Sequence, residues 1–336
     1  MSSSRKWLRR LVVAALLALL AGVAAGWWWL NRPLPLRNER AEVSIEPGTT
    51  PREVVNLWVE AGVDVPAEAL YQWFRWSGQA RRIRAGSYEI GAGTTPRELL
   101  DKMVRGEETL EMLRLIDGWT FRQVRQAIAA APNLKQTIAS LSDQQVAQLL
   151  NLPHGVVEGH VFPDTYAYSR GVSDITVLRR AAAAMERHLA AAWPARAEDL
   201  PLPNPEAALV LASIVEKETG VATDRSRIAA VFVNRLKIGM PLQSDPTVIY
   251  GLGERFDGNL RRVDLVTDTP WNTYTRAGLP PTPIAMPSLA SLQAALRPEP
   301  IKALYFVARG DGSSVFSESL DDHNRAVNQY QKGPRK

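Results

Sequence analysis

The stretch from 204 to 220 reads Asn-Pro-Glu-Ala-Ala-Leu-Val-Leu-Ala-Ser-Ile-Val-Glu-Lys-Glu-Thr-Gly and predicts a buried helix. Asn204 suits the N-cap, Pro205 suits the first helical position, and Gly220 suits the position just past the helix end. The residues between them are apolar on nearly every side for more than two turns, which is typical of a helix enclosed by protein. We therefore expect the fold to be built around this helix.

Two carboxylates lie where this helix ends, Glu216 and Glu218. Burial and the negative end of the helix dipole both raise the pKa of a carboxyl group. A carboxyl that stays protonated near neutral pH can act as a general acid. The spacing of the residues does not show which glutamate is the candidate acid, because each of them continues an apolar stripe of the helix. The alternative is that one or both are solvated and pair with Lys217 or Arg225.

An apolar run from Leu11 to Leu30 predicts a transmembrane helix. Its 20 residues would form about 30 Å of helix, the thickness of a bilayer core. Tryptophans at 27–29 end the run as an interfacial belt would, and the basic flank at 1–10 predicts a cytoplasmic N-terminus. The bulk of the chain is then expected outside the cytoplasm. A cleaved signal peptide ending near 23–25 is the alternative.

Composition excludes several classes of function. The net charge is +5, but four positive charges precede residue 11, so the remainder is nearly neutral and gives no indication of nucleic-acid binding. The chain has no cysteine, which excludes disulfides, thiol nucleophiles and thiolate metal sites. The histidines lack metal-ligand spacing and no phosphate-binding glycine loop is present, so we predict neither a metal nor a cofactor.

Residues 42–110 are predicted to form a small α+β module. The segment 47–54 recurs at 92–99, with a weaker echo at 117–124, and each copy follows a strand-like segment and opens a helix. The expected N-caps are Thr50, Thr95 and Thr120. Aromatic side chains of the module either pack its core or offer a face for sugars, and core packing is favoured for most of them. These aromatic residues are Trp58, Tyr71, Trp73, Phe74 and Trp76.

The remainder of the chain reads as a mixed α+β domain. Helices are expected over 174–193, 205–219, 225–238, 288–296 and 320–331, with strands at 304–308 and 315–317. The helix 225–238 is expected to expose Asn234 and Arg235 near its end. Between 240 and 287 the chain shows little periodicity and is rich in proline, so we expect a long functional loop there. Ser213 lies in no Gly-x-Ser-x-Gly motif and is expected to bond back to a helix carbonyl.

Polar and aromatic side chains of the 240–287 stretch suit a sugar-binding cleft beside one acid. Rings can cover the apolar faces of pyranoses, while amides and hydroxyls recognise hydroxyl and N-acetyl groups. The alternative is a proline-rich loop whose polar side chains satisfy its own backbone. The residues alone leave both interpretations open.

Several motifs together resemble the signature of the MltG/YceG family of endolytic murein transglycosylases. These motifs are Leu211–Thr219, Val233–Leu236, Leu242–Gly251, Asn272–Tyr274, Gly278–Pro281, Glu158-Gly159 and Phe162–Tyr166. The similarity covers nearly the whole chain. The chain departs from the family at Thr282 and Ser288, loop positions where the family often has glycine.

The resemblance implies a membrane-anchored wall enzyme. The family's members lie in the inner membrane and face the periplasm or outer surface, with a LysM-like glycan-binding part at the N-terminal side. Their catalytic domain cuts the β-1,4 bond between N-acetylmuramic acid (MurNAc) and N-acetylglucosamine (GlcNAc). By position in the motif, Glu218 corresponds to the catalytic glutamate, and Glu216 is then expected to be structural. The predicted substrate-binding residues are Asn234, Gln243, Ser244, Asp245, Tyr250, Asn272 and Tyr274.

A single glutamate suffices for the activity that the resemblance implies. Glu218 would protonate the glycosidic oxygen, then accept the proton of the C6 hydroxyl as that oxygen closes on C1 to give a 1,6-anhydro end. Such an enzyme could terminate elongation of nascent strands. One alternative is a hydrolase in which Asp245 or Glu216 activates water. Others are a non-catalytic glycan-binding scaffold of the wall-synthesis machinery and a cofactor-dependent lyase, the last disfavoured because no cofactor site is recognisable.

The sequence thus predicts an α+β protein with one transmembrane helix, a LysM-like module and a catalytic domain. The expected partners are peptidoglycan glycan strands, the inner membrane and elongation or division proteins, with no nucleic acid. The expected boundaries are 1–10 for the cytoplasmic flank, 11–30 for the anchor, 31–41 for a linker, 42–110 for the LysM-like module, 111–331 for the catalytic domain and 332–336 for a tail.

Overall fold

The computed structural model describes residues 2–331, and the predicted tail at 332–336 lies outside them. Met1 of the predicted basic flank lies outside them as well. The chain divides into two compact units. The first holds the residues up to Glu111 together with Tyr168–Gly171, and the second holds Met112–Ala167 and the residues from Val172 onward. The class is mixed α+β with small sheets, which confirms the predicted fold class.

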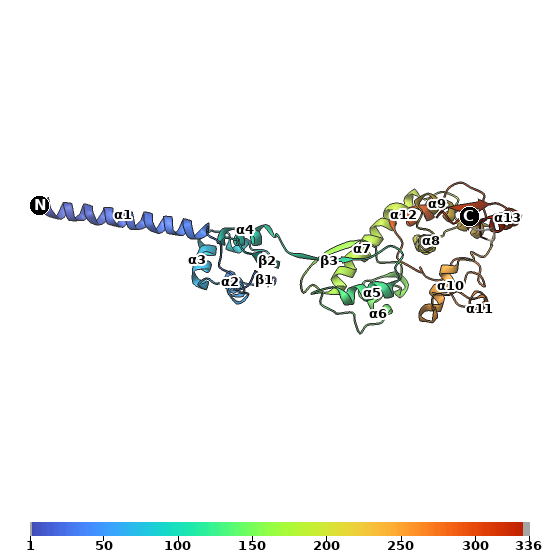
Figure 1. Ribbon diagram of the computed structural model, residues 1–336, viewed down its shortest axis with the longest axis horizontal. Helices are drawn as coiled ribbons and strands as arrows, with labels where there is room; N and C mark the ends of the chain where they lie inside the picture. Colours follow the sequence, from blue (N-terminus) through green and yellow to red (C-terminus); the bar gives the residue numbers. More distant parts are fainter. Residues whose placement is uncertain (1, 332–336) are drawn as a thin grey trace. The chain divides into compact units, whose positions relative to one another are not determined.

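Helix α1, Ser2–Leu30, is one continuous helix at the start of the chain (Figure 1). Its segment Arg9–Leu30 has a mean hydropathy of 2.2, and none of that segment is buried. Leucine and valine side chains are therefore exposed all round the helix. By length and composition this segment can cross a membrane, as the apolar run predicts.

The first unit contains a strand–helix–helix–strand unit followed by a third helix. Its elements are β1 (Arg40–Ile45), α2 (Pro51–Glu60), α3 (Ala67–Trp76), β2 (Gly86–Gly91) and α4 (Pro96–Arg105). Strands β1 and β2 pair antiparallel, with Val43 opposite Tyr88. The LysM-like character of this unit stays a prediction.

The threonine N-caps predicted from the repeat are confirmed. Thr50 and Thr95 each form a capping box with the glutamate three residues later, Glu53 and Glu98, and a proline follows each cap. Thr120 caps its helix in the same way, with a glutamine in place of the glutamate. Each box satisfies backbone N–H groups that the first helical turn leaves without partners.

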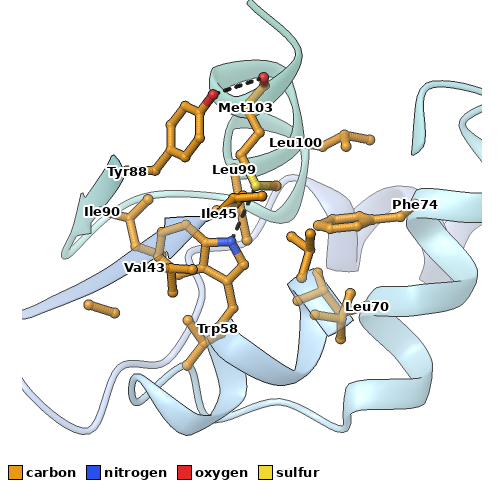
Figure 2. Close-up of a cluster of buried hydrophobic side chains, with 14 of the residues drawn as sticks. Val43, Ile45, Trp58, Leu70, Phe74, Tyr88, Ile90, Leu99, Leu100 and Met103 are labelled. Atoms are coloured by element: carbon orange, nitrogen blue, oxygen red, sulfur yellow. Dashed lines mark hydrogen bonds between the residues drawn. The ribbon is translucent and has the colours of Figure 1, made fainter. Parts of the chain in front are cut away.

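Figure 2 shows the closed core of the first unit, where strand and helix side chains converge. The Trp58 indole N–H donates to the Met103 sulfur at 3.3 Å, and the Tyr88 hydroxyl donates to the Met103 carbonyl at 3.4 Å. Trp58 and Phe74 are fully buried. Tyr71 and Trp73 pack partly against the same core, so core packing is confirmed for four of the five predicted aromatic residues. The fifth, Trp76, is 79% exposed.

The second unit is mainly helical. Its helices are α5 (Phe121–Ala130), α6 (Asp143–Leu149), α7 (Asp174–Ala192), α8 (Pro205–Glu218), α9 (Ala222–Lys237), α10 (Asp245–Leu252), α11 (Arg262–Val266), α12 (Leu289–Leu296) and α13 (Leu320–Tyr330). Its C-terminal hairpin pairs β5 (Tyr305–Ala308) with β6 (Ser314–Ser317). A further pair joins β3 (Leu110–Arg114) and β4 (Thr165–Ser169), and each of these strands has residues assigned to both units.

The core of this unit forms around α8, as the opening stretch predicts. Helix α8 packs against α9 and α12, and residues 208–215 are all buried. Within it the Ser213 hydroxyl donates to the Val210 carbonyl at 2.7 Å, which confirms the predicted back-bond. The same hydroxyl accepts the Ile284 N–H at 3.0 Å, and so ties the later loop to the helix.

One secondary-structure expectation for the second unit is wrong. The stretch 240–287 is not a loop throughout, because it contains α10 and α11. Pro246 lies in the first turn of α10, where backbone N–H groups have no acceptor within the helix. A proline, which lacks this N–H, is therefore tolerated there and is compatible with the start of a helix. The remaining predicted helices and strands agree with the structure to within a few residues at their ends.

Candidate active site

Helix α8 carries Glu218 to the edge of the buried core. The Asn204 side chain caps the helix by accepting the Ala207 N–H at 2.9 Å, and Pro205 follows as the first helical residue. At the other end the helix stops at Glu218, because Thr219 takes an extended backbone. The carboxyl therefore lies where a rigid apolar element meets polar loops, a placement that supports precise chemistry.

Burial raises the pKa of the Glu218 carboxyl to about 7, and the negative charge of Asp245 adds to this effect. Two contacts oppose it: the Ser244 hydroxyl donates to Glu218 Oε1 at 2.5 Å, and the Arg235 charge is close enough to favour ionisation. With a pKa near neutrality, the group is available both as a proton donor and as a proton acceptor. This is the property that acid–base catalysis requires.

Ser244 is held in place by the loop that follows α11. Its N–H donates to the Thr273 hydroxyl at 3.0 Å, and the Gln243 N–H donates to the Thr273 carbonyl at 3.0 Å. Gln243 has φ of 49°, a left-handed backbone that costs a non-glycine residue energy. Such strain is often found at functional sites, and here it precedes the serine that contacts Glu218.

Asp245 and Tyr274 form a second polar pair beside Glu218. The Tyr274 hydroxyl donates to Asp245 Oδ1 at 2.6 Å. Burial first, and then the neighbouring carboxylates, raise the pKa of Tyr274, so its phenol stays protonated as a donor. The structure thus brings Glu218, Ser244, Asp245 and Tyr274 into one cluster, and their roles in catalysis and substrate binding stay predictions.

The two predicted asparagines mainly hold the backbone. Asn272 is fully buried, and its amide nitrogen donates to three carbonyls, those of Asp264, Leu265 and Thr267. Its side-chain oxygen accepts the Tyr274 N–H at 2.8 Å. The Asn234 amide donates to the carbonyls of Ile301 and Ala303, at 2.9 and 3.0 Å. The amide nitrogens of both residues already donate to backbone carbonyls of the protein. A role of either residue in substrate binding stays a prediction.

Tyr250, on α10, meets a second buried carboxyl. Its hydroxyl donates to Glu158 Oε2 at 3.2 Å, and the Phe121 N–H donates to both oxygens of Glu158, at 3.0 and 3.1 Å. Burial raises the pKa of Glu158 to about 7, although these hydrogen bonds lower it. The next residue, Gly159, has φ of 82°, and a Cβ there would lie 2.4 Å from Pro283 Cβ. Only glycine fits this position, which fixes the segment that carries Glu158.

A cavity of about 890 Å³ is lined by Glu158 and Tyr250, whereas Glu218, Ser244, Asp245 and Tyr274 are not among its lining residues. Its walls come from α5, α6, α8, α10 and the loops that follow α6, α10 and α11. Lys217 and Pro246, the chain neighbours of Glu218 and Asp245, both line it. Its other lining residues include Gln123, Gln126, Glu158, Tyr250, Phe256 and Trp271. Aromatic rings next to amides and carboxylates form the kind of surface that binds sugars.

The other glutamate of the pair has a structural contact. Glu216 Oε2 accepts the N–H and the hydroxyl of Ser288, at 3.0 and 2.5 Å. Ser288 is the N-cap of α12, so Glu216 stabilises the start of that helix. The contact accords with the structural role expected for Glu216 and leaves Glu218 as the glutamate held by the loop cluster.

Sequence reasoning placed Arg235 wrongly and overlooked Glu158 as a site residue. Arg235 was expected to be exposed, but it is 7% exposed, because its guanidinium donates to the carbonyls of Leu304, Pro241 and Leu242. The sequence could have indicated this burial, because Arg235 lies on the same face of α9 as buried apolar residues such as Ile228 and Val231. For Glu158, the signal was a carboxylate directly before a glycine in a turn-rich segment.

The described residues 2–331 contain no group of three or more histidine, aspartate or glutamate side chains arranged to hold a metal ion.

The profile of the YceG-like family matches residues 43–329. The endolytic murein transglycosylase of Bacillus subtilis (strain 168) is 29% identical over 306 residues, covering 86% of this chain and 84% of that protein. The endolytic murein transglycosylase of Streptococcus pneumoniae (strain ATCC BAA-255 / R6) is 26% identical over 322 residues, which cover 86% of this chain but 58% of that longer protein.

A solved structure shows the same architecture. The crystal structure of a YceG-like protein from Listeria monocytogenes superposes with a TM-score of 0.56 at 29% identity, and covers 85% of this chain and 99% of that one. The family match begins within β1 of the first unit and includes Glu218, Ser244, Asp245 and Tyr274. The chain belongs to the YceG-like family.

Proposed function

We propose that this protein is a membrane-anchored endolytic lytic transglycosylase, a lyase that cleaves the β-1,4 bond between MurNAc and GlcNAc inside peptidoglycan strands. The observation that carries the proposal is the Glu218 carboxyl, half-buried at the end of α8 with its pKa raised to about 7. Support comes from family membership and from the relatives, which are named endolytic murein transglycosylases.

In the first half of the reaction, protonated Glu218 donates its proton to the glycosidic oxygen. The bond from that oxygen to C1 of MurNAc breaks, and the GlcNAc residue leaves with a hydroxyl group. Positive charge develops at C1, where the carboxylate of Asp245 and the newly formed carboxylate of Glu218 can stabilise it. Ser244 and the Tyr274 hydroxyl hold these two carboxylates in position.

In the second half, the ionised Glu218 accepts the proton of the C6 hydroxyl of the same MurNAc. The C6 oxygen then bonds to C1 and closes a 1,6-anhydro ring. Glu218 returns to its protonated form, and no water is consumed. A carboxyl with a pKa near neutrality can serve in both halves with little energetic penalty.

Localisation follows from α1, whose Arg9–Leu30 segment is able to span a membrane. We place the N-terminus in the cytoplasm and both units on the periplasmic side of the inner membrane, because basic residues precede the apolar segment. There the enzyme would meet nascent strands and terminate their elongation. Protease added to intact spheroplasts should digest both units, and their full protection would overturn this orientation.

Mass spectrometry of the products tests the activity. The full-length protein in detergent micelles is incubated with uncrosslinked glycan strands, with Glu218→Gln as the control. Fragments that end in 1,6-anhydro-MurNAc and are absent in the control are expected. Fragments one water heavier would replace the proposal with a hydrolase. Strand binding without cleavage would favour the non-catalytic scaffold.

A further inference from the structure

Glu158 is a buried carboxyl that the proposed reaction does not use. It is 8% exposed, and it comes from the loop after α6, far in sequence from Glu218. Its oxygens accept the Phe121 N–H at the start of α5 and the Tyr250 hydroxyl on α10. It therefore joins two helices that line the same cavity.

Helix α10 is held at two points by a carboxyl, which is half-buried for Glu218 and buried for Glu158. Its N-cap, Ser244, donates to Glu218, and Tyr250, near its other end, donates to Glu158. The eight residues of α10 are too few for a stable helix in isolation, so its position depends on such tertiary contacts. A change at Glu158 should therefore reach the cavity wall through Tyr250.

The ring of Tyr250 forms one part of an aromatic wall of the cavity. It meets the Trp271 ring edge-on, with centroids 5.4 Å apart and an interplanar angle of 69°. The Trp271 indole N–H donates to the Thr282 hydroxyl at 2.9 Å. Tyr250 is thus held by Glu158, and Thr282 contacts both rings, through the Trp271 indole and the Tyr250 hydroxyl.

We propose that Glu158 is a positioning residue of the active site, which holds the Tyr250 hydroxyl and so fixes the Tyr250–Trp271 wall against which a sugar ring of the substrate packs. The proposal rests on the proposed function only in taking a glycan strand as the substrate. Glu158 touches no reacting atom in this scheme. Its loss should therefore weaken strand binding far more than it slows the chemical step.

The experiment measures strand affinity and kinetics separately. Uncrosslinked glycan strands are titrated onto the full-length protein in detergent micelles, in a Glu218→Gln background in which strands stay intact. The values of kcat and KM are measured with Glu218 present. The variants are Glu158→Ala, Glu158→Gln, Tyr250→Phe and the double variant Glu158→Ala with Tyr250→Phe.

Glu158→Ala and Tyr250→Phe should each weaken strand binding about 10-fold, the effect of one hydrogen bond to a carboxyl, with kcat changed less than about 3-fold. Glu158→Gln should bind nearly as well as the wild type, because its amide oxygen can still accept the Tyr250 hydroxyl. The double variant should be no worse than the weaker-binding of the two single variants, since both changes remove the bond between Glu158 and Tyr250.

Asp174→Asn is the matched control. Asp174 is a fully buried carboxylate that accepts the N–H groups of Thr137 and Ile138, yet it does not line the cavity. Its substitution should lower stability without changing strand affinity. An equal loss of affinity in Asp174→Asn and Glu158→Ala would show that Glu158 is merely structural.

Other outcomes also decide the proposal. Tyr250→Phe binding strands as tightly as the wild type would overturn it, and this variant serves even if Glu158→Ala does not fold. Additive losses in the double variant would overturn it too. A wild-type protein that binds strands but leaves no 1,6-anhydro ends would overturn the proposed function alone, because the affinity data still report on Glu158. Absence of strand binding by the wild type would overturn both.

Discussion

The core of the first unit and the cluster around α10 in the second unit use similar side chains for different ends. In the first, the polar atoms of Trp58 and Tyr88 donate to the sulfur and carbonyl of Met103, groups that do not titrate. In the second, the hydroxyls of Tyr250 and Tyr274 donate to the carboxyls of Glu158 and Asp245, and the Tyr250–Glu158 pair lines a cavity. Buried aromatic residues alone therefore indicate packing, whereas buried hydroxyls paired with carboxyls next to open space indicate chemistry.

The largest effect is expected from Glu218→Gln, which removes the titrating group and keeps its shape. Cleavage should fall at least about 10³-fold, because the glycosidic oxygen loses its proton donor. The rate at which 1,6-anhydro ends appear measures the loss, and far-UV circular dichroism checks that the fold remains. Near-full activity in this variant would remove Glu218 from the mechanism and break the comparison.

Trp58→Ala tests the closed core of the first unit, where we expect a loss of stability and not a loss of catalysis. The free energy of unfolding of the first unit should fall by about 3–5 kcal/mol, because a fully buried indole leaves a cavity behind. Hydrogen exchange of amides in β1, β2 and α2 measures the loss. Trp76→Ala is the control, since a side chain that is 79% exposed should matter by less than about 0.5 kcal/mol. A folded Trp58→Ala protein with no cleavage activity would contradict the separation of packing from chemistry.

The two regions should also differ in how stability depends on pH. Burial raises the Glu218 pKa from 4.5 to about 7, so the unfolded chain ionises first as pH rises. Stability that is present below pH 4.5 is thus lost progressively up to about pH 7, by up to roughly 3 kcal/mol. Glu218→Gln cannot ionise, so its stability relative to the wild type should rise across this window.

Thermal melts at several pH values measure the stability difference between Glu218→Gln and the wild type. Trp58→Ala is the comparison, because its stability difference from the wild type should be the same at each pH. Cleavage by the wild type should fall as pH rises through about 7, because the acid form of Glu218 starts the reaction. A constant stability difference between Glu218→Gln and the wild type would show that Glu218 is not buried as described.

Local signals predicted much of this molecule. The threonine caps followed by a glutamate or glutamine three residues later, and the all-round apolar helix α8, are encoded within a few neighbouring residues. The membership of Glu218, Ser244, Asp245 and Tyr274 in one cluster came from a resemblance to a family, because nothing in their spacing brings them together.

What the sequence did not reveal depends on contacts between distant segments. Glu158 acquires its raised pKa from burial against helices that come before and after it in the chain. Arg235 is buried because three backbone carbonyls from two other segments accept its N–H groups. Helix α10 has eight residues and begins with an Asp-Pro pair, so it shows neither the length nor the periodicity from which helices are predicted.

The smallest effect should come from Glu216→Gln. Comparing this variant with Glu218→Gln is informative because Glu216 lies only two residues before Glu218. The amide oxygen can still accept the N–H and hydroxyl of Ser288, so cleavage should stay within about 3-fold of the wild type and stability should fall by at most about 1 kcal/mol. Ser288→Ala, which removes the N-cap of α12, should cost about the same stability. If Glu216→Gln instead abolished cleavage as completely as Glu218→Gln, two carboxyls would be needed for the reaction. The hydrolase in which the second carboxylate activates water would then be the better account of this site.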